Sequence, residues 1–306
     1  MLRLILLLVA SLLAAPAIHA APFSFAVIGD VPYGPPEELS ALASRLNRQP
    51  IAFTLHLGDI KTGTSRCSDD VFLRVRAQFS EFDKPLVYTP GDNEWTDCHR
   101  YLAGSYDPLE RLEKIRSLFF ATAESHGKEK LALQSQRGDP QHGRHVENLR
   151  WFRDKLSFAT LHLVGSNNNW QPDLPSVSEF AAREEANLAW LRETFATAKA
   201  RNDVAVVLAM QADTFFATPS AESGFTRWLQ ALADEAVRWS KPVLLLQGDS
   251  HRYRVDHPLH DAHGKPVPNL LRVVVPGDRN PDAVLVEFDP SRPTQPFRIR
   301  LMSEPR

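Results

Sequence analysis

Short apolar runs alternate with amphipathic segments along most of the chain. Residues 23–28, 52–57 and 85–88 are apolar runs of strand length, and each is soon followed by Gly-Asp. Between the first two runs, Pro36 can start a helix, because leucines recur after it at spacings of three and four. The inward-facing residues of this helix would be Leu39, Leu42 and Leu46. The order of strands and helices predicts a βαβ series, and so an α/β domain.

The same alternation continues in the second half. We expect strands over residues 156–164, 204–210 and 243–246. A capping pair, Ser176 and Glu179, predicts the start of a long helix after the first of these strands, and a second helix precedes the last. The inward-facing residues would be Leu188, Leu191 and Phe195 in the first helix and Trp228, Leu229 and Leu232 in the second.

Two regions break this pattern. Residues 98–150 contain one predicted helix, capped by Asp107 with Pro108 in its first turn, and then a polar stretch. We interpret them as a helical and loop insertion in a single domain over residues 21–306. The tail holds three apolar runs without helices between them, at residues 270–275, 283–288 and 297–301. They predict a second, partly antiparallel sheet that closes the domain.

The first twenty residues are typical of a secretory signal peptide. Arg3 precedes an apolar run over residues 4–15, and small residues follow at Ala17 and Ala20. The alternative is a membrane anchor, but twelve apolar residues are too short for a bilayer core of ~30 Å. We therefore expect a periplasmic or secreted protein with no membrane span after signal cleavage.

Composition and charge argue against nucleic acids and anionic membranes as binding partners. Among 306 residues, 35 Lys and Arg oppose 37 Asp and Glu, so the net charge is −2 and no excess of positive charge attracts nucleic acid or anionic membranes. No nucleic-acid partner is expected. Six Trp and 17 Phe argue for a folded core rather than a disordered chain.

Export changes the interpretation of the two cysteines. An oxidising compartment favours a disulfide between Cys67 and Cys98, and each lies a few residues beyond an aspartate that ends a predicted strand. Closing a loop of about thirty residues would stabilise the fold by roughly 3–4 kcal/mol. Two buried free thiols are the alternative.

Aspartates follow four of the predicted strands in Gly-Asp pairs, and a histidine lies close to the last of them. The residues are Asp30, Asp59, Asp92, Asp249 and His251. Because the carboxyl ends of strands line the ligand crevice of an open α/β sheet, these side chains are expected to converge. Converging carboxylates repel unless a cation neutralises them, which favours a divalent metal site. The alternative is that Gly-Asp only provides a good turn after a strand.

The order of these motifs resembles the calcineurin-like metallophosphoesterase superfamily. The matching stretches are Ile28-Gly-Asp30, Leu57-Gly-Asp59, Pro90-Gly-Asp-Asn-Glu94, Met210-Gln211 and Gln247-Gly-Asp-Ser-His251. The resemblance implies an α/β fold in which two mixed β-sheets pack as a sandwich flanked by helices. Several residues differ from the family pattern: Pro32, Asn93, Gln211 and Asp249 replace histidines, and Asp92 replaces an asparagine.

Position by position, the resemblance implies two divalent metal ions bridged by Asp59. Asp30 and His251 would complete one site, and Asp92, Gln211 and Asp249 would complete the other. Oxygen ligands in place of imidazoles favour Mg²⁺, Mn²⁺ or Ca²⁺ over Zn²⁺. The purple acid phosphatase branch has a tyrosine ligand at the position of Thr62, so an iron–tyrosinate centre is not expected.

The resemblance implies hydrolysis of a small phosphomonoester or phosphodiester by a metal-activated water, with Asp59, His251 and Asn93 as catalytic residues. Asn93, Lys61 and Arg252 are candidates for binding the substrate, although the two cations could equally be solvated surface residues. The alternative function is a catalytically inactive module that binds a metal or an anion on the same fold. Loss of the usual acid histidine at Asn93 keeps this alternative open.

Overall fold

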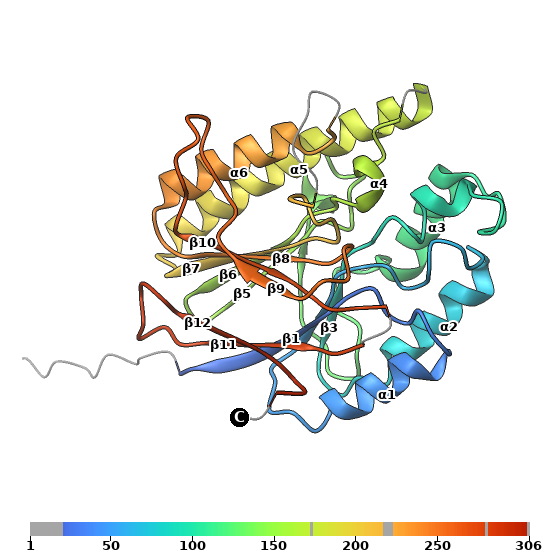
Figure 1. Ribbon diagram of the computed structural model, residues 1–306, viewed down its shortest axis with the longest axis horizontal. Coiled ribbons are helices and arrows are strands. Elements are labelled where there is room, and N and C mark those ends of the chain that lie inside the picture. Colours follow the sequence, from blue (N-terminus) through green and yellow to red (C-terminus); the bar gives the residue numbers. More distant parts are fainter. Residues whose placement is uncertain (1–20, 172–173, 217–222, 279–280, 305–306) are drawn as a thin grey trace, which may run out of the picture.

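The computed structural model describes residues 21–171, 174–216, 223–278 and 281–304. Two mixed sheets lie face to face, with helices on both outer sides (Figure 1). This arrangement confirms the predicted fold class. The predicted signal peptide, residues 1–20, lies outside the described residues. Within the part of the chain that is described, no helix is both long and apolar enough to cross a membrane.

The first sheet has five strands in the order β12-β11-β1-β2-β3. Its parallel strands are β1 (Phe23–Ile28), β2 (Thr54–His56) and β3 (Leu86–Tyr88), as the apolar runs predict. Helices α1 (Glu37–Leu46) and α2 (Asp69–Phe79) connect them. The predicted inward face of α1 is buried, and Leu39, Leu42 and Leu46 are each at most 2% exposed.

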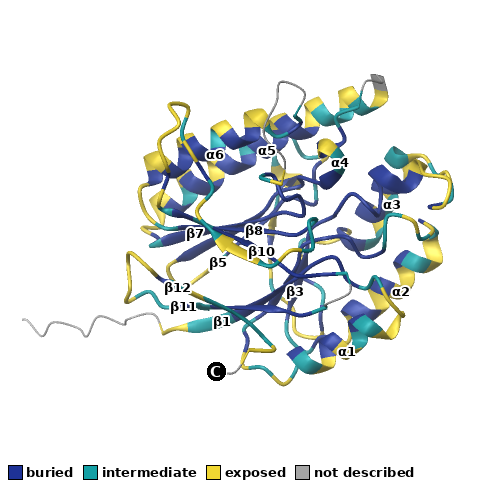
Figure 2. Cartoon of the chain, viewed as in Figure 1, coloured by how far each residue is buried: buried dark blue, intermediate teal, exposed yellow. Residues whose placement is uncertain are grey.

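The second sheet has seven strands in the order β4-β5-β6-β7-β8-β10-β9. Its parallel part is β6 (Leu156–Thr160), β7 (Ala205–Ala209), β8 (Val243–Gln247) and β10 (Leu270–Val274). The antiparallel edges are β4 (Gln134–Ser135), β5 (Leu149–Arg153) and β9 (Arg254–Asp256). Helices α5 (Leu174–Ala200) and α6 (Thr226–Trp239) lie against the outer face, and their solvent sides are exposed (Figure 2).

The prediction of a separate sheet in the tail is wrong. Strand β10 joins the second sheet parallel to β8, whereas β11 (Val284–Phe288) and β12 (Phe297–Leu301) extend the first sheet beside β1. Without β11, the apolar and buried strand β1 would have one unpaired edge. Likewise α5 begins at Leu174, so Ser176 lies inside the helix instead of capping it.

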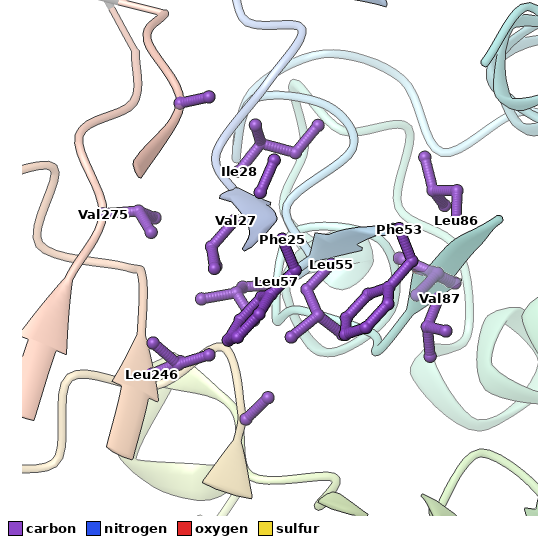
Figure 3. Packing of buried hydrophobic residues seen from close by; sticks show 14 of the residues in the cluster. Phe25, Val27, Ile28, Phe53, Leu55, Leu57, Leu86, Val87, Leu246 and Val275 are labelled. Atoms are coloured by element: carbon purple, nitrogen blue, oxygen red, sulfur yellow. The ribbon is translucent and has the colours of Figure 1, made fainter. Parts of the chain in front are cut away.

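Aromatic side chains fill the space between the two sheets. Phe25 of β1 stacks on Phe53 at 5.1 Å, and the edge of Phe158 from β6 meets Phe25 at 5.4 Å. Figure 3 shows Phe25 and Phe53 within the buried apolar cluster, together with Leu246 of β8. Full burial of each such side chain stabilises the fold by about 1.5–3 kcal/mol, so this core fixes the two sheets against one another.

Residues 98–150, the predicted insertion, contain α3 (Pro108–Phe119) and the short elements β4 and η2 (Gln136–Gly138). The Asp107 side chain accepts a hydrogen bond from the backbone of Leu109, which is the cap that the sequence predicts. The short helix η1 (Thr96–His99) overlaps the start of this region. The expected disulfide links it to the segment after β2, since Cys67 and Cys98 are bonded with their Cα atoms 5.7 Å apart.

Candidate metal centre

Five parallel strands from the two sheets end at one edge of the sandwich. Asp30, Asp59 and Asp92 follow β1, β2 and β3 of the first sheet, and Gln211 and Asp249 follow β7 and β8 of the second. A site at this edge can therefore form only when both sheets are in place. This is the juncture at which open α/β sheets usually bind ligands.

Two groups of side chains at this edge could each hold a metal ion. The first comprises Asp30, Asp59 and His251, and the second comprises Asp59, Asp92 and Asp249. In each group the potential ligand atoms all lie within 4.8 Å of one another. Asp59 belongs to both, which is the geometry expected of a carboxylate shared by two cations.

The backbone at these positions is strained. Asp30, Asp59, Asp249 and His251 have φ angles of 54°, 57°, 70° and 55°. Non-glycine residues seldom adopt this left-handed region, and each costs about 1–3 kcal/mol. Gly91 lets the loop after β3 approach Asp59, because a Cβ atom there would collide with the Asp59 backbone nitrogen and carboxylate. Strain of this kind persists where side chains are held in fixed positions.

In the first group, Asp30 is held from two sides. Its Oδ1 lies 3.1 Å from His251 Nε2 and 3.1 Å from the backbone nitrogen of Asp249, which donates to it. Burial raises the pKa of Asp30 despite the opposing effect of His251. Burial also disfavours protonation of His251, but the hydrogen bond and charge of Asp30 outweigh it, so the pKa of His251 is raised.

The shared Asp59 accepts hydrogen bonds on both carboxylate oxygens. The backbone nitrogen of Asn93 donates to Oδ1 at 3.2 Å. Tyr33 Oη and Asn93 Nδ2 donate to Oδ2, each at 2.6 Å. Burial, followed by the charges of Asp92 and Glu94, raises the pKa of Asp59 well above its ordinary value.

The second group is organised around Gln211. Its Nε2 donates to Asp92 Oδ1 at 3.1 Å and to Asp249 Oδ1 at 3.2 Å, while its Oε1 accepts from the backbone of Gly165 at 2.6 Å. The amide nitrogen, rather than the oxygen expected of a metal ligand, therefore faces the carboxylates. Ser166 Oγ donates to Asp92 Oδ2 at 2.7 Å. Burial and then the charges of Asp92 and Asp30 raise the pKa of Asp249 to about 8.

The two predicted substrate-binding cations occupy different environments. Lys61 is only 3% exposed, and its ammonium donates to the backbone oxygens of Asn93 at 2.5 Å and of Thr62 at 2.8 Å. Arg252 is exposed, with its guanidinium carbon 5.8 Å from the centroid of the Phe216 ring. Thus Lys61 is buried against the backbone of the Asn93 loop, and Arg252, which follows His251 in the sequence, is exposed to solvent.

Tyr33 and Ser166 reach the site although sequence reasoning assigned neither of them a role. Tyr33 stands three residues after Asp30, and an aromatic hydroxyl so close to the first Gly-Asp was the available signal. Ser166 belongs to a run of four consecutive residues, Ser166 to Asn169, with φ between 49° and 59°. Only the folded chain brings this left-handed turn against Asp92.

The electrostatics of the site fit a divalent cation. Four aspartates approach one another in a largely buried region, with Lys61 and His251 as the positive or protonatable groups beside them. Burial of carboxylates without full countercharge is costly, and it raises their pKa values. Carboxylate oxygens are the ligands that hard divalent cations prefer. These residues are therefore suited to hold two such ions.

Replacement of the shared carboxylate tests this arrangement. Asp59→Asn is expected to weaken Mn²⁺ binding at both groups. Loss of an outer-shell partner lowers metal affinity by roughly 10–100-fold, and loss of a shared ligand should lower it at least as much. Asp30→Asn should weaken only one of the two binding events. Calorimetric titration with Mn²⁺ measures this, with Asp70→Asn on the exposed start of α2 as the matched control. Equal Mn²⁺ stoichiometry and affinity in wild type and Asp59→Asn would contradict the assignment.

The raised pKa of Asp249 predicts the pH dependence of stability in EDTA. Its pKa rises from 3.8 to about 8 on folding, so the folded state binds this proton more tightly than the unfolded state. The free energy of unfolding should therefore fall as pH increases between about 4 and 8. Urea denaturation across this range should give a steeper fall for wild type than for Asp249→Asn. Identical pH profiles would show that Asp249 does not titrate in this way.

No protein-family model and no curated protein matches the sequence. Solved structures do resemble the fold. A dimetal phosphatase from Danio rerio aligns with a TM-score of 0.56 and 14% identity over 87% of this chain and 95% of its own.

Two further solved structures are larger than this chain. The PhoD structure gives a TM-score of 0.50 at 12% identity, over 90% of this chain and 65% of its own. Purple acid phosphatase PPD1 from yellow lupin (Lupinus luteus) seeds gives 0.51 at 10% identity, over 88% of this chain and 49% of its own. At these identities the likeness establishes the fold, and the chain has the calcineurin-like metallophosphoesterase fold that the order of its motifs predicts.

Proposed function

We propose that this protein is an exported, metal-dependent phosphoesterase that hydrolyses small phosphomonoesters or phosphodiesters. The observation that carries the proposal is the pair of acidic groups that share Asp59 at the edge where both sheets end. The dimetal phosphatase with the same fold supports it. A carboxylate shared by two adjacent sites can hold a pair of metal ions close enough for both to act on one phosphoryl group.

Asp30, Asp59 and His251 would hold one cation, and Asp59, Asp92 and Asp249 the other. We propose Gln211 as a ligand of the second cation only after rotation of its amide, because Gly165 now holds its oxygen. The ligand set favours Mg²⁺, Mn²⁺ or Ca²⁺ over Zn²⁺. When bound, such ions lower the pKa of a coordinated water and stabilise charge on the phosphoryl oxygens.

The remaining residues bind and orient the substrate. Asn93 presents its amide nitrogen beside the shared carboxylate, where it can donate to a phosphoryl or leaving-group oxygen. Lys61 is a positioning residue in this proposal, because its ammonium donates a hydrogen bond to the Asn93 backbone oxygen. Arg252 is the exposed cation beside His251 that can meet the negative charge of an incoming ester.

The second candidate is a catalytically inactive module that binds a metal or an anion. Asn93 favours it, because an amide cannot protonate a leaving group. Hydrolysis of generic phosphomonoesters and phosphodiesters, measured with each divalent metal in turn, separates the two functions. Metal-dependent binding of phosphate without turnover would establish the binding module.

Because Asn93 cannot act as an acid, we expect the rate of hydrolysis to depend strongly on the pKa of the leaving group. General acid catalysis contributes about 10²–10⁴-fold, and a nitrophenolate needs little of it. Aryl phosphoesters should therefore be cleaved far faster than alkyl phosphoesters at saturating Mn²⁺. Rates across a series of esters with increasing leaving-group pKa give the slope. A nearly flat series, with chemistry rate-limiting, would mean that another residue supplies the proton.

We also propose a periplasmic or secreted location, supported by the signal-like start of the sequence and by the disulfide. The exported protein should begin near Ala21 and contain no thiol that reacts with an alkylating agent under non-reducing denaturing conditions. Intact mass before and after alkylation measures both properties. Retention of the first twenty residues, or modification of Cys67 and Cys98, would contradict this location.

A further inference from the structure

The Tyr33 hydroxyl occupies a central position in the site. It lies 2.6 Å from Asp59 Oδ2, to which it donates, and 2.5 Å from Asn93 Nδ2, from which it accepts. Asn93 Nδ2 is itself 2.6 Å from the same Asp59 oxygen. One hydroxyl, one amide and one carboxylate oxygen thus form a closed triangle on the carboxylate that both acidic groups share.

The position of Tyr33 is fixed at its ring and at its backbone. Its ring meets the His251 ring edge-on, with centroids 5.2 Å apart and an interplanar angle of 89°. The backbone nitrogens of Tyr33 and Gly34 donate to Glu38 Oε2 at 2.9 and 3.1 Å, so the first turn of α1 holds the loop. The hydroxyl is therefore placed in the site by several contacts.

Tyr33 is suited to donate a hydrogen bond rather than to carry a negative charge. A phenol ordinarily has a pKa of about 10, and the Tyr33 hydroxyl already donates its hydrogen to Asp59 Oδ2. The phenol consequently keeps its proton, and it can supply one O–H to a neighbouring acceptor.

If Asp59 Oδ2 coordinated a metal ion, this triangle of hydrogen bonds would not stay intact. A carboxylate oxygen offers about two lone-pair positions, and Tyr33 and Asn93 already occupy both at Asp59 Oδ2. Coordination of a cation by this oxygen would free at least one of the two donors. Asn93 is buried and Tyr33 is partly buried, so either donor is costly to leave without an acceptor, and the site then favours a ligand that presents oxygen atoms at this point.

We propose that Tyr33 Oη and Asn93 Nδ2 form a donor pair that binds a non-bridging oxygen of a phosphate group at the metal centre. The inference rests on the proposed function, since it assumes that a phosphate group enters the site. It assigns Tyr33 as a substrate-contacting residue, and a tetrahedral oxyanion suits the pair because one oxygen can accept from both donors.

Binding of inorganic phosphate to the Mn²⁺-loaded protein tests the pair without catalysis. Tyr33→Phe keeps the ring that packs against His251 and removes only the hydroxyl. A hydrogen bond to a charged group contributes enough to expect a loss of phosphate affinity of about 10–100-fold by calorimetry. Tyr101→Phe, at a tyrosine that is 88% exposed, is the matched control and should bind phosphate as wild type does.

Asn93→Ala removes the other donor and provides a second, independent variant if Tyr33→Phe unfolds. The two substitutions should be non-additive in the double variant, because each disrupts the same pair. The Mn²⁺ content of Tyr33→Phe should equal that of wild type. Unchanged phosphate affinity in Tyr33→Phe, or loss of its Mn²⁺, would overturn the assignment of Tyr33 as a phosphate donor. Failure of the wild-type, Mn²⁺-loaded protein to bind phosphate would overturn the proposed function and this inference with it.

Discussion

Repulsion among carboxylates that converge in a buried space is the constraint on which the site depends. Water would screen these charges, but burial removes it and raises the pKa values of Asp30, Asp59 and Asp249. The protein compensates with donors aimed at the carboxylates, among them the Asp249 backbone nitrogen and the Gln211 amide. These dipoles hold the side chains in place, but they carry no net charge. A divalent cation would supply the missing charge, which is the physical basis for considering this edge a candidate metal centre.

The two halves of the site come from different sheets, so its geometry depends on the core between them. Asp59 belongs to the first sheet and Asp249 to the second, and both contribute to one acidic group. The aromatic contacts between Phe25 and Phe158 fix the spacing of those sheets. Close-packed cores transmit small displacements. A change in this core would therefore shift the two acidic groups without altering any of their residues.

The rim of the site is held by a buried charged residue. The guanidinium of Arg183 donates to the Asn168 backbone and side-chain oxygens at 2.8 and 2.5 Å and to Glu179 at 2.6 Å. These bonds support the left-handed turn that carries Ser166 to Asp92. Lys61 and the disulfide support a second loop, the one that carries Asn93. These contacts offset the free energy lost to left-handed backbone and to burial of polar groups in the two loops that contact the acidic residues.

The sequence by itself determined the parallel strands β1, β2, β3, β6, β7 and β8, the helix α1 and the convergence of the four aspartates, because apolar periodicity and Gly-Asp turns are local and parallel strands end at one edge. Tertiary structure alone decided which sheet each tail strand joins, because strand pairing depends on partners far away in the chain. It also decided that Lys61 turns toward backbone oxygens, that the Gln211 amide nitrogen faces the carboxylates, and that Tyr33 meets Asp59. Side-chain direction follows from neighbours that only the folded chain brings together, so no local pattern reveals it.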